Sequence, residues 1–354
     1  MITAVFTQWK FEVPILSLCV NRNGDWVAAA LADGTARLLP ASDEAITPKV
    51  VKMHDGISLS LQPDADAHAF LSGGDDGKVL ILDPTTDSTT PLAEQSRPTI
   101  WIDHVASSAD GKFRAYNEGK IIHVLNEEGH EHFTPLLSVP TNPGGISFSP
   151  NGKRLAVSHY NGVTLWWLNS KKAEATTLEW KGSHLDMIWS PDGKALLTSM
   201  QENALHGWLL SDDNKEMRMQ GYMSKIRSMA FTPRGKYLAT SGAQQVICWP
   251  FSGGGPWGKA PLMLGGAENR LVTQVAPHPQ DEMVAAGYSD GMIVLAPLDG
   301  RMEMMINPPT PTTNPAINGL VWNANGDALF ASTESGLLFL FTIDSVKKAL
   351  VHPN

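Results

Sequence analysis

The chain repeats one short pattern along its whole length. Its clearest copy runs from Phe148 to Trp167, and the next two copies begin at Trp189 and Phe231. Each of these three copies holds a first turn, of the Asn-Gly, Asp-Gly or Arg-Gly type, and then a second turn. Asn-Gly and Asp-Gly between apolar runs indicate hairpins, because a type I′ turn needs two residues with φ > 0. The second turns lie 41 to 47 residues apart and end at Gly34, Gly77, Gly119, Gly162, Asn203, Gln244, Gly291 and Gly336.

Each of these eight repeats predicts three strands and a looser fourth. In the fourth repeat the first three strands are expected at 146–149, 154–158 and 163–168. A period of roughly 40–45 residues with about four short strands is typical of a β-propeller, in which each repeat forms one blade. We therefore predict one all-β domain over residues 1–354, a closed β-propeller of eight four-stranded blades. Seven blades is the alternative, if one atypical repeat is discounted.

The two ends of the sequence suggest how the ring closes. The last repeat stops after its third strand, at 337–342, whereas the chain begins with a spare strand-like run at 3–9. We predict that this N-terminal strand completes the last blade. Closure of the ring removes the sheet edges that would otherwise invite aggregation.

The repeats resemble those of the WD-repeat family of β-propellers. The turn at 190–193, Ser-Pro-Asp-Gly, and the strand ending at 33–39 carry the resemblance. The sequence contains no Trp-Asp dipeptide, and Met53-His54 and Ser183-His184 alone echo the family's Gly-His pair. The family's hydrogen-bonded network of a His, a turn Asp and a Trp is therefore degenerate here. The resemblance implies a binding face where the second turns meet the connections between blades.

Composition and charge narrow the class of partner. The formal net charge is −9 and the pI is about 5.6, which disfavours non-specific binding to nucleic acid or to an anionic membrane. No apolar stretch reaches the length of a transmembrane helix, and the first dozen residues lack the features of a secretory signal. Cys19 and Cys248 fall in distant repeats, so we expect two reduced, buried thiols. These features together predict a cytoplasmic protein.

The sequence contains no recognisable catalytic set. It has no glycine-rich phosphate loop and no serine in a nucleophile-elbow context. We therefore predict a non-catalytic protein–protein interaction scaffold without a cofactor, whose partner is another protein or a peptide. The alternative is a metal-dependent hydrolase or lactonase-like enzyme with a site at the channel mouth.

A second alternative is a metal-handling accessory protein that uses His130 and His132. A His-x-His pair on a strand points both rings to one face, and imidazoles suit Zn²⁺ or Cu²⁺. However, the sequence identifies no third ligand, and a solvated polar loop is the simpler interpretation of this segment.

Aromatic and arginine side chains on the binding face are the strongest candidates for partner contacts. Trp, Tyr and Arg most often dominate the binding energy of protein interfaces. By their position in the repeats, the candidates are Arg97, Trp101, His159, Tyr160, His184, Arg227, Arg270 and Tyr288.

Overall fold

The structure of the chain is a computed structural model that describes residues 6–42, 46–94, 100–170, 172–253, 255–266, 268–309 and 316–342. These residues form antiparallel strands and no helix, so the predicted all-β class is confirmed. The chain divides into two compact units: unit 1 is Met1–Leu31, Leu38–Pro48 and Gly221–Asn354, and unit 2 is Ala32–Arg37 and Lys49–Gln220. The expectation of a single domain stays a prediction.

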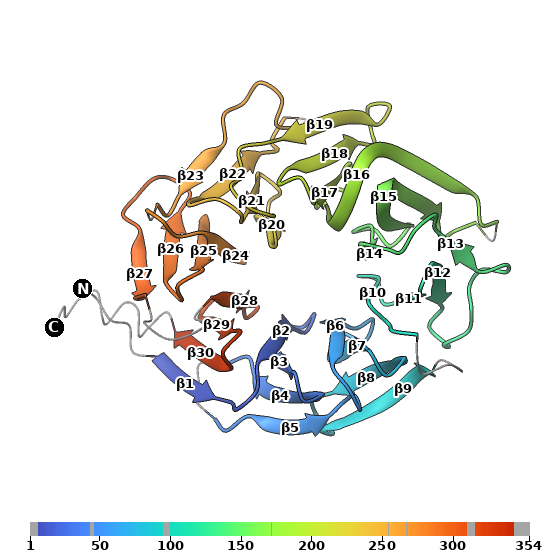
Figure 1. Ribbon diagram of the computed structural model, residues 1–354, viewed down its shortest axis with the longest axis horizontal. Helices are drawn as coiled ribbons and strands as arrows, with labels where there is room; N and C mark the ends of the chain where they lie inside the picture. The colour runs from blue at the N-terminus through green and yellow to red at the C-terminus, as the bar shows by residue number, and fades with distance from the viewer. Residues whose placement is uncertain are drawn as a thin grey trace. The chain divides into compact units, whose positions relative to one another are not determined.

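Three four-stranded sheets lie entirely within the described part of unit 1 (Figure 1). The first two follow sequence order, and in each the strands are joined by short connections. The first sheet is β20 (Met229–Phe231), β21 (Tyr237–Thr240), β22 (Val246–Pro250) and β23 (Leu262–Leu264). The second is β24 (Val272–Pro277), β25 (Met283–Tyr288), β26 (Ile293–Pro297) and β27 (Met304–Asn307).

The third sheet of unit 1 joins the two ends of the chain. It consists of β28 (Ile317–Trp322), β29 (Ala328–Thr333), β30 (Leu337–Thr342) and β1 (Phe6–Lys10). Strand β1 pairs antiparallel with β30, from Phe6 opposite Phe341 to Lys10 opposite Leu337. The prediction that the N-terminal strand completes the last sheet is confirmed by this pairing, with the strand at 6–10 where the sequence suggested 3–9.

A fourth sheet is divided by the boundary between the units, which falls within β4. It contains β2 (Ile15–Val20), β3 (Trp26–Leu31), β4 (Thr35–Pro40) and β5 (Lys49–Lys52). On the unit 1 side, Val27 and Leu31 are buried with Phe330 and Leu340 in one hydrophobic cluster.

Unit 2 carries two regular sheets and one longer sheet. The first is β6 (Ser58–Pro63), β7 (Phe70–Gly74), β8 (Lys78–Asp83) and β9 (Ser88–Glu94). The second is β10 (Val105–Ser107), β11 (Arg114–Glu118), β12 (Ile121–Leu125) and β13 (Leu137–Ser138). The longer sheet is β14 (Gly145–Phe148), β15 (Arg154–Trp167), β16 (Ala175–Trp189), β17 (Ala195–Met200), β18 (Leu205–Leu209) and β19 (Lys215–Met219).

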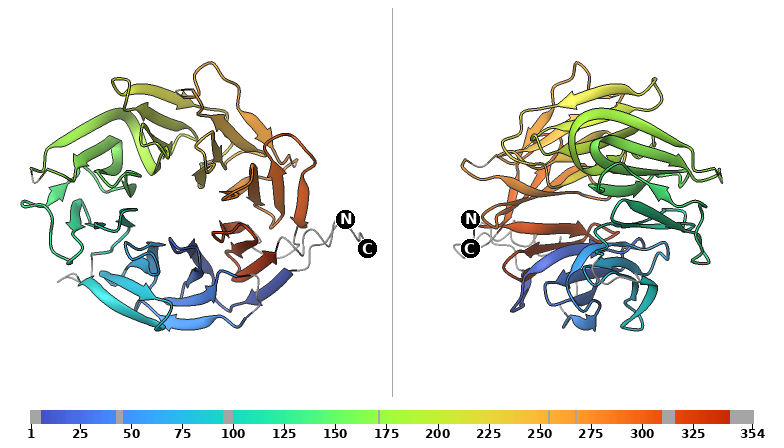
Figure 2. Two further views of the ribbon diagram at one scale, coloured as in Figure 1. Left: turned by 180° about the vertical axis from the view of Figure 1, so that it is seen from behind. Right: turned by 45° about the vertical axis from the view of Figure 1, so that its right-hand side comes forward.

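The longer sheet contains the fourth and fifth sequence repeats. Strand β15 folds back on itself, since the backbone N–H of Leu168 donates to the carbonyl of Lys153 at 2.9 Å. Strand β16, green in Figures 1 and 2, pairs with β15 over its first half and with β17 over its second half. The described strands therefore form seven hydrogen-bonded sheets, the alternative count, instead of eight separate ones. The two counts differ because one continuous strand serves two repeats.

The first turn of a repeat has the hydrogen bonds that its Ser and Asp residues predict. In the fifth repeat the Ser190 hydroxyl donates to Asp192 at 2.6 Å and accepts from the Ala195 N–H at 2.9 Å. Gly193 follows with a φ of 67°. Each short polar side chain thus satisfies backbone groups of the turn, which leaves the flanking apolar residues free to pack. Below this turn, Leu196 and Trp208 are buried in the core of unit 2.

The histidine network of the repeats is reduced but not absent. His54 bonds to Ser72 Oγ and to Asp76 Oδ1, each at 2.9 Å. His184 bonds to Thr198 Oγ1 at 2.7 Å. In unit 1 a tyrosine takes the corresponding place: the Tyr222 hydroxyl accepts from Trp249 Nε1 at 2.7 Å and bonds to Thr240 at 2.8 Å.

Candidate interaction surface

Three of the predicted partner-binding residues lie near one another in unit 2. Tyr160 stands at the tip of the β15 hairpin, next to His159 in the chain and opposite Ser183 of β16. His184 follows Ser183, and its Nε2 lies 2.9 Å from the carbonyl oxygen of Trp180. Tyr160 therefore marks a place where the tip of β15 meets the middle of β16.

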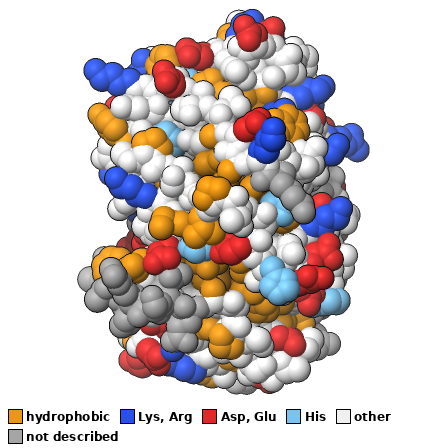
Figure 3. Space-filling view, turned by 90° about the vertical axis from the view of Figure 1, so that its right-hand side faces the viewer, with side chains coloured by type: hydrophobic (Ala, Val, Ile, Leu, Met, Phe, Trp, Pro, Cys, Tyr) orange, Lys and Arg blue, Asp and Glu red, His pale blue; other side chains and the backbone are white. Residues whose placement is uncertain are grey.

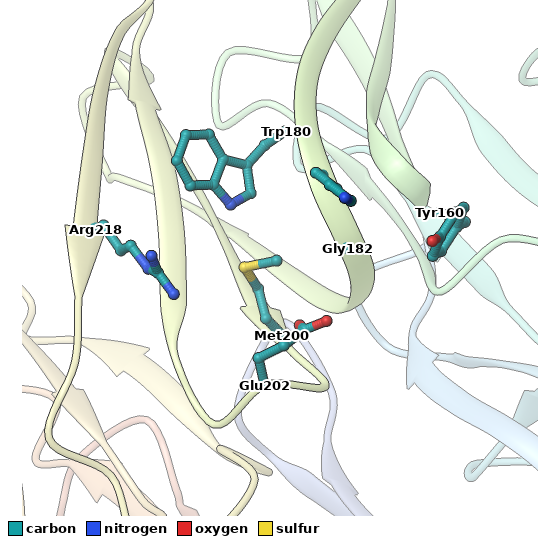
Figure 4. A pocket seen from close by; sticks show the side chains of 7 residues that line it. Tyr160, Trp180, Gly182, Met200, Glu202 and Arg218 are labelled. Atoms are coloured by element: carbon teal, nitrogen blue, oxygen red, sulfur yellow. The ribbon is translucent and has the colours of Figure 1, made fainter.

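A recess of about 320 Å³ opens at this place, and we name it the Trp180 recess. Figure 4 shows the Trp180, Met200 and Arg218 side chains converging on it, with Glu202 below them. A second recess of about 720 Å³ shares Tyr160, Trp180 and Lys181 with the first. The Trp180 recess is lined by Tyr160, Trp180, Lys181, Gly182, Met200, Glu202 and Arg218.

Gly182 shapes the floor of the recess. Its φ is +126°, a conformation that favours glycine, and a Cβ atom there would lie 2.8 Å from Met200 Cε. The Gly182 N–H donates to Asn161 Oδ1 at 3.1 Å, which ties β16 to the tip of β15. Strand β16 can therefore cross close over Met200, and the strand carries Trp180 to the edge of the recess.

Trp180 rests on a buried histidine. The rings of Trp180 and His206 stack with their centroids 4.0 Å apart and their planes 14° from parallel. His206 is 0% exposed, and within the described part of the chain neither of its ring nitrogens has a hydrogen-bond partner. Burial, with the nearby His184 and Arg218, lowers the pKa of His206 to about 3. His206 is therefore a neutral aromatic platform at pH 7.

Charged side chains border the recess. The Arg218 guanidinium carbon lies 6.0 Å from the centroid of the Trp180 ring, at the outer limit of a cation–π contact. Lys181 and Glu202 are exposed and form no ion pair with any residue that the structure describes. Two cations and one anion thus line the recess, in a chain whose net charge is −9.

The predicted partner-binding residues of unit 2 differ in how far their side chains are exposed to solvent. Tyr160 is 52% exposed and Trp101 is 57% exposed, although Trp101 does not line the Trp180 recess. His159 and His184 are buried, and His159 Nε2 bonds to Thr164 Oγ1 at 2.8 Å. These two histidine side chains satisfy internal polar groups, so neither presents a surface to a partner as the sequence had suggested. Arg97 lies outside the described residues.

The predicted partner-binding residues of unit 1 also differ in their exposure to solvent and in their side-chain contacts. Arg227 is exposed, and its backbone N–H donates to Ser241 Oγ at 3.1 Å. The Arg270 guanidinium forms an ion pair with Asp290. Tyr288 is fully buried and its hydroxyl donates to the Gly265 carbonyl, so it serves the core and not a contact surface. Burial raises the pKa of the Tyr288 hydroxyl.

The His130 and His132 side chains do not converge on a common ion site. His132 Nε2 donates to the Leu168 carbonyl at 2.7 Å, whereas His130 is exposed and lies 3.2 Å from Glu128. Among the residues described, no group of three or more His, Cys, Asp or Glu side chains could hold a metal. On the face drawn in Figure 3, histidine, acidic and basic side chains are interspersed. The His-x-His motif therefore lacks the converging geometry that a metal site needs.

Neither cysteine has the environment of a reactive thiol. Cys19 and Cys248 are free and buried, as predicted. Burial raises the pKa of each thiol to about 12, so both remain protonated at neutral pH.

The sequence did not single out Trp180, Met200 or Arg218 as site residues. In the sequence, Trp180 follows the third predicted strand of the fourth repeat, and Arg218 lies after the second turn of the fifth repeat. The one available signal was Trp180-Lys181-Gly182, in which a large aromatic residue and a glycine occur together without a turn motif. Only the fold shows that β16 continues through this segment.

Comparison with known proteins agrees with the repeats and sheets. The family model "WD domain, G-beta repeat" matches residues 4–38 and 214–249. The ciliary WD repeat-containing protein ctxp80 of Euplotoides octocarinatus is 26% identical over 67% of this chain and 30% of its own length. These matches support a resemblance to the WD-repeat family of β-propellers.

Other similar proteins match shorter parts of the chain. The chromatin assembly factor 1 subunit FAS2 homolog of Oryza sativa subsp. japonica is 28% identical over 27% of this chain and 20% of its own length. The meiotic recombination protein rec14 of Schizosaccharomyces pombe is 27% identical over 41% of this chain and 50% of its own length. The chain thus spans half or less of the length of these relatives. Where the structure describes the chain, no helix has the length and apolar character needed to cross a membrane.

Proposed function

We propose that this protein is a non-catalytic protein–protein interaction scaffold and that the surface around Tyr160 and Trp180 binds its partner. One observation carries the proposal: large aromatic side chains stand partly exposed beside a recess, on strands β15 and β16, which pair with each other on both sides of Trp180. Aromatic side chains that fill or line well-packed pockets commonly dominate interface energy. The partner is proposed to be a protein or a peptide.

Exposed aromatic residues are the reason to prefer binding over catalysis. Trp101 and Tyr160 each leave more than half of their surface in solvent, although most large apolar side chains of the described residues are buried. Exposed apolar surface next to polar side chains marks interaction sites. A rigid surface of this kind binds with little loss of conformational entropy.

The enzymatic alternatives have less support from the geometry. A metal-dependent hydrolase needs at least three converging protein ligands, and the described residues do not offer such a group. The side chains of His130 and His132 also contact different groups of the chain, Glu128 and the Leu168 carbonyl. A metal-handling role would require a further ligand from outside the described residues.

The cellular location and the closed ring also belong to the proposal. We place the protein in the cytoplasm because of its two buried, free thiols and its acidic charge. The relatives' names include a chromatin assembly factor subunit and a transcriptional corepressor, LEUNIG_HOMOLOG of Arabidopsis thaliana. Cell fractionation that compares nuclear and cytoplasmic pools tests this location directly.

A partner captured from the native cell allows the contact residues to be tested. We expect Tyr160→Ala or Trp101→Ala to weaken binding by about 2 kcal/mol, roughly thirtyfold, because truncation removes a desolvated anchor. Arg227→Ala tests the same prediction in unit 1. The dissociation constants are measured by isothermal titration calorimetry with the purified partner.

Met302→Ala serves as the matched control, because Met302 is highly exposed and lies outside both recesses. Thermal unfolding of each variant confirms that the fold is retained. The proposed surface around Tyr160 and Trp180 is wrong if Tyr160→Ala leaves the affinity unchanged, and the interface lies elsewhere if Trp101→Ala and Arg227→Ala also leave it unchanged. If the full chain binds no protein specifically, the proposed scaffold function itself is wrong.

A further inference from the structure

We propose that the Trp180 recess binds an acidic peptide segment with an aromatic or aliphatic anchor residue, in which the anchor packs against Trp180 and Met200 while a neighbouring carboxylate meets Arg218 and Lys181. The inference rests on the proposed function, because it names the chemistry of the partner at that same surface. It is carried by the shape, the rigidity and the charge of the recess.

The recess has the size and lining of an anchor pocket. Its volume of about 320 Å³ lies at the lower end of the range for small-ligand pockets, which suits a single large side chain better than an extended ligand. Met200 is buried at its floor, and Trp180 is partly exposed at its wall. An inserted apolar side chain would therefore contact apolar atoms on two sides.

The aromatic wall is held in place before any ligand arrives. His206 stacks beneath Trp180, and Trp208 meets the His206 ring edge-on with centroids 4.6 Å apart. Strand β16 also pairs with β15 at Glu179 and at Ser183, on either side of Trp180, and with β17 from His184 onward. Little side-chain entropy remains to be lost at Trp180 when a ligand binds, which favours affinity.

The charges of the recess select an acidic segment over a basic one. Arg218 and Lys181 supply two positive charges to the lining and Glu202 supplies one negative charge. At physiological salt the Debye length is about 8 Å, so the charges that line the recess outweigh the distant acidic residues of the chain, and the nearby Glu179 lines the adjoining recess and not this one. The planar Arg218 guanidinium also matches the geometry of a carboxylate.

A pair of labelled peptides tests the charge selection. The probes are fluorescein-labelled Gly-Asp-Phe-Asp-Gly and Gly-Lys-Phe-Lys-Gly, with blocked ends, titrated with the full chain in a fluorescence anisotropy assay. We expect the acidic peptide to bind at least about tenfold more tightly than the basic one, because like charges placed together are strongly unfavourable. The proposal is overturned if the basic peptide binds equally or better, or if neither binds with a Kd below about 1 mM.

Charge variants then localise the binding. Arg218→Glu should weaken the acidic peptide by at least about tenfold. Lys215→Glu is the matched control, because it makes the same change in net charge on the same strand β19 but does not line the recess. We expect the control to bind the peptide within about twofold of wild type. Equal affinities of the two variants would overturn the assignment.

A second variant keeps the test decisive if Arg218→Glu does not fold. Lys181→Glu reverses an exposed charge of the recess, and it should also weaken the acidic peptide and not the basic one. Circular dichroism and thermal unfolding establish which variants are folded. If neither peptide binds while a captured protein partner still depends on Tyr160, the acidic-anchor inference is wrong and the scaffold function stands.

Discussion

His206, which stacks against Trp180, makes the stability of the folded chain depend on pH. The imidazole is buried, stacked on Trp180 and without a hydrogen-bond partner in the part of the chain that the structure describes. Protonation would place a charge there without compensation, and this is why the pKa of His206 falls to about 3. The folded state therefore favours the neutral form of this ring.

This residue makes stability depend on pH in one direction. In the unfolded chain His206 titrates near its ordinary pKa of 6.5, whereas in the folded chain it stays neutral down to about 3. Between these values the unfolded state binds the extra proton, so stability is complete above pH 6.5 and falls as the pH is lowered. The loss from one such group approaches about 1.4 kcal/mol per pH unit.

We expect His206→Leu to flatten the dependence of unfolding free energy on pH between 7 and 5. The variant removes the titrating ring, while His54 and His184, whose pKa values are also lowered by burial, keep part of the dependence. Urea unfolding at several pH values measures the slope. His130→Leu, at an exposed position, is the control, and equal slopes for the two variants would contradict this role of His206.

At the scale of elements, the continuous strand β16 decides how two repeats are joined. Its first half pairs with β15 and its second half with β17, and Gly182 lies between these halves. The sequence predicts a loose outer strand and a separate inner strand here. Tertiary packing over Met200 instead favours one extended segment, because glycine allows a close crossing and a φ of +126°.

Gly182→Ala should destabilise the chain by about 1–3 kcal/mol, because the new methyl group meets Met200 and the backbone conformation becomes strained. Gly221→Ala separates the two causes: Gly221 also has a positive φ, of +109°, but no atom lies within 4 Å of its added Cβ. Urea unfolding measures both variants. The steric part of the argument fails if the two substitutions cost the same.

At the scale of the whole molecule, the N-terminal strand links the first residues of the chain to the last sheet. Strand β1 covers the edge of β30, whose Leu338 and Leu340 are buried in a cluster with partly buried Trp9. Without β1 the backbone groups of β30 would present an unpaired edge, which is a site for aggregation. The proposed closure of the ring depends on this pairing.

Deletion of residues 1–10 is expected to lower the unfolding free energy by at least about 3 kcal/mol, since each uncovered leucine loses roughly 1.5–3 kcal/mol of burial. Urea unfolding and size-exclusion chromatography measure stability and self-association. Gln8→Ser, at an exposed position of the same strand, should behave like wild type. A truncated chain that remains monomeric and as stable as the full chain would refute closure through β1.

The sequence by itself determined the repeat, the all-β class and the pairing partner of the N-terminal strand. These features follow from local chemistry: turns such as Ser190 to Gly193 need particular residues, and apolar runs of strand length lie between them. Exposure could not be read in the same way. Tyr160 and Tyr288 both lie shortly before the last residue of a second turn, Gly162 or Gly291, yet Tyr160 is half exposed and Tyr288 is buried.

Only the tertiary structure decided which residues form the recess. Trp180, Met200 and Arg218 belong to three different strands, and their meeting depends on the continuous course of β16 and on the stacking of Trp180 over His206. The sequence specifies each turn through a few adjacent residues, whereas a recess depends on packing between residues far apart in the chain. For this reason the repeat could be read from the sequence and the binding surface could not.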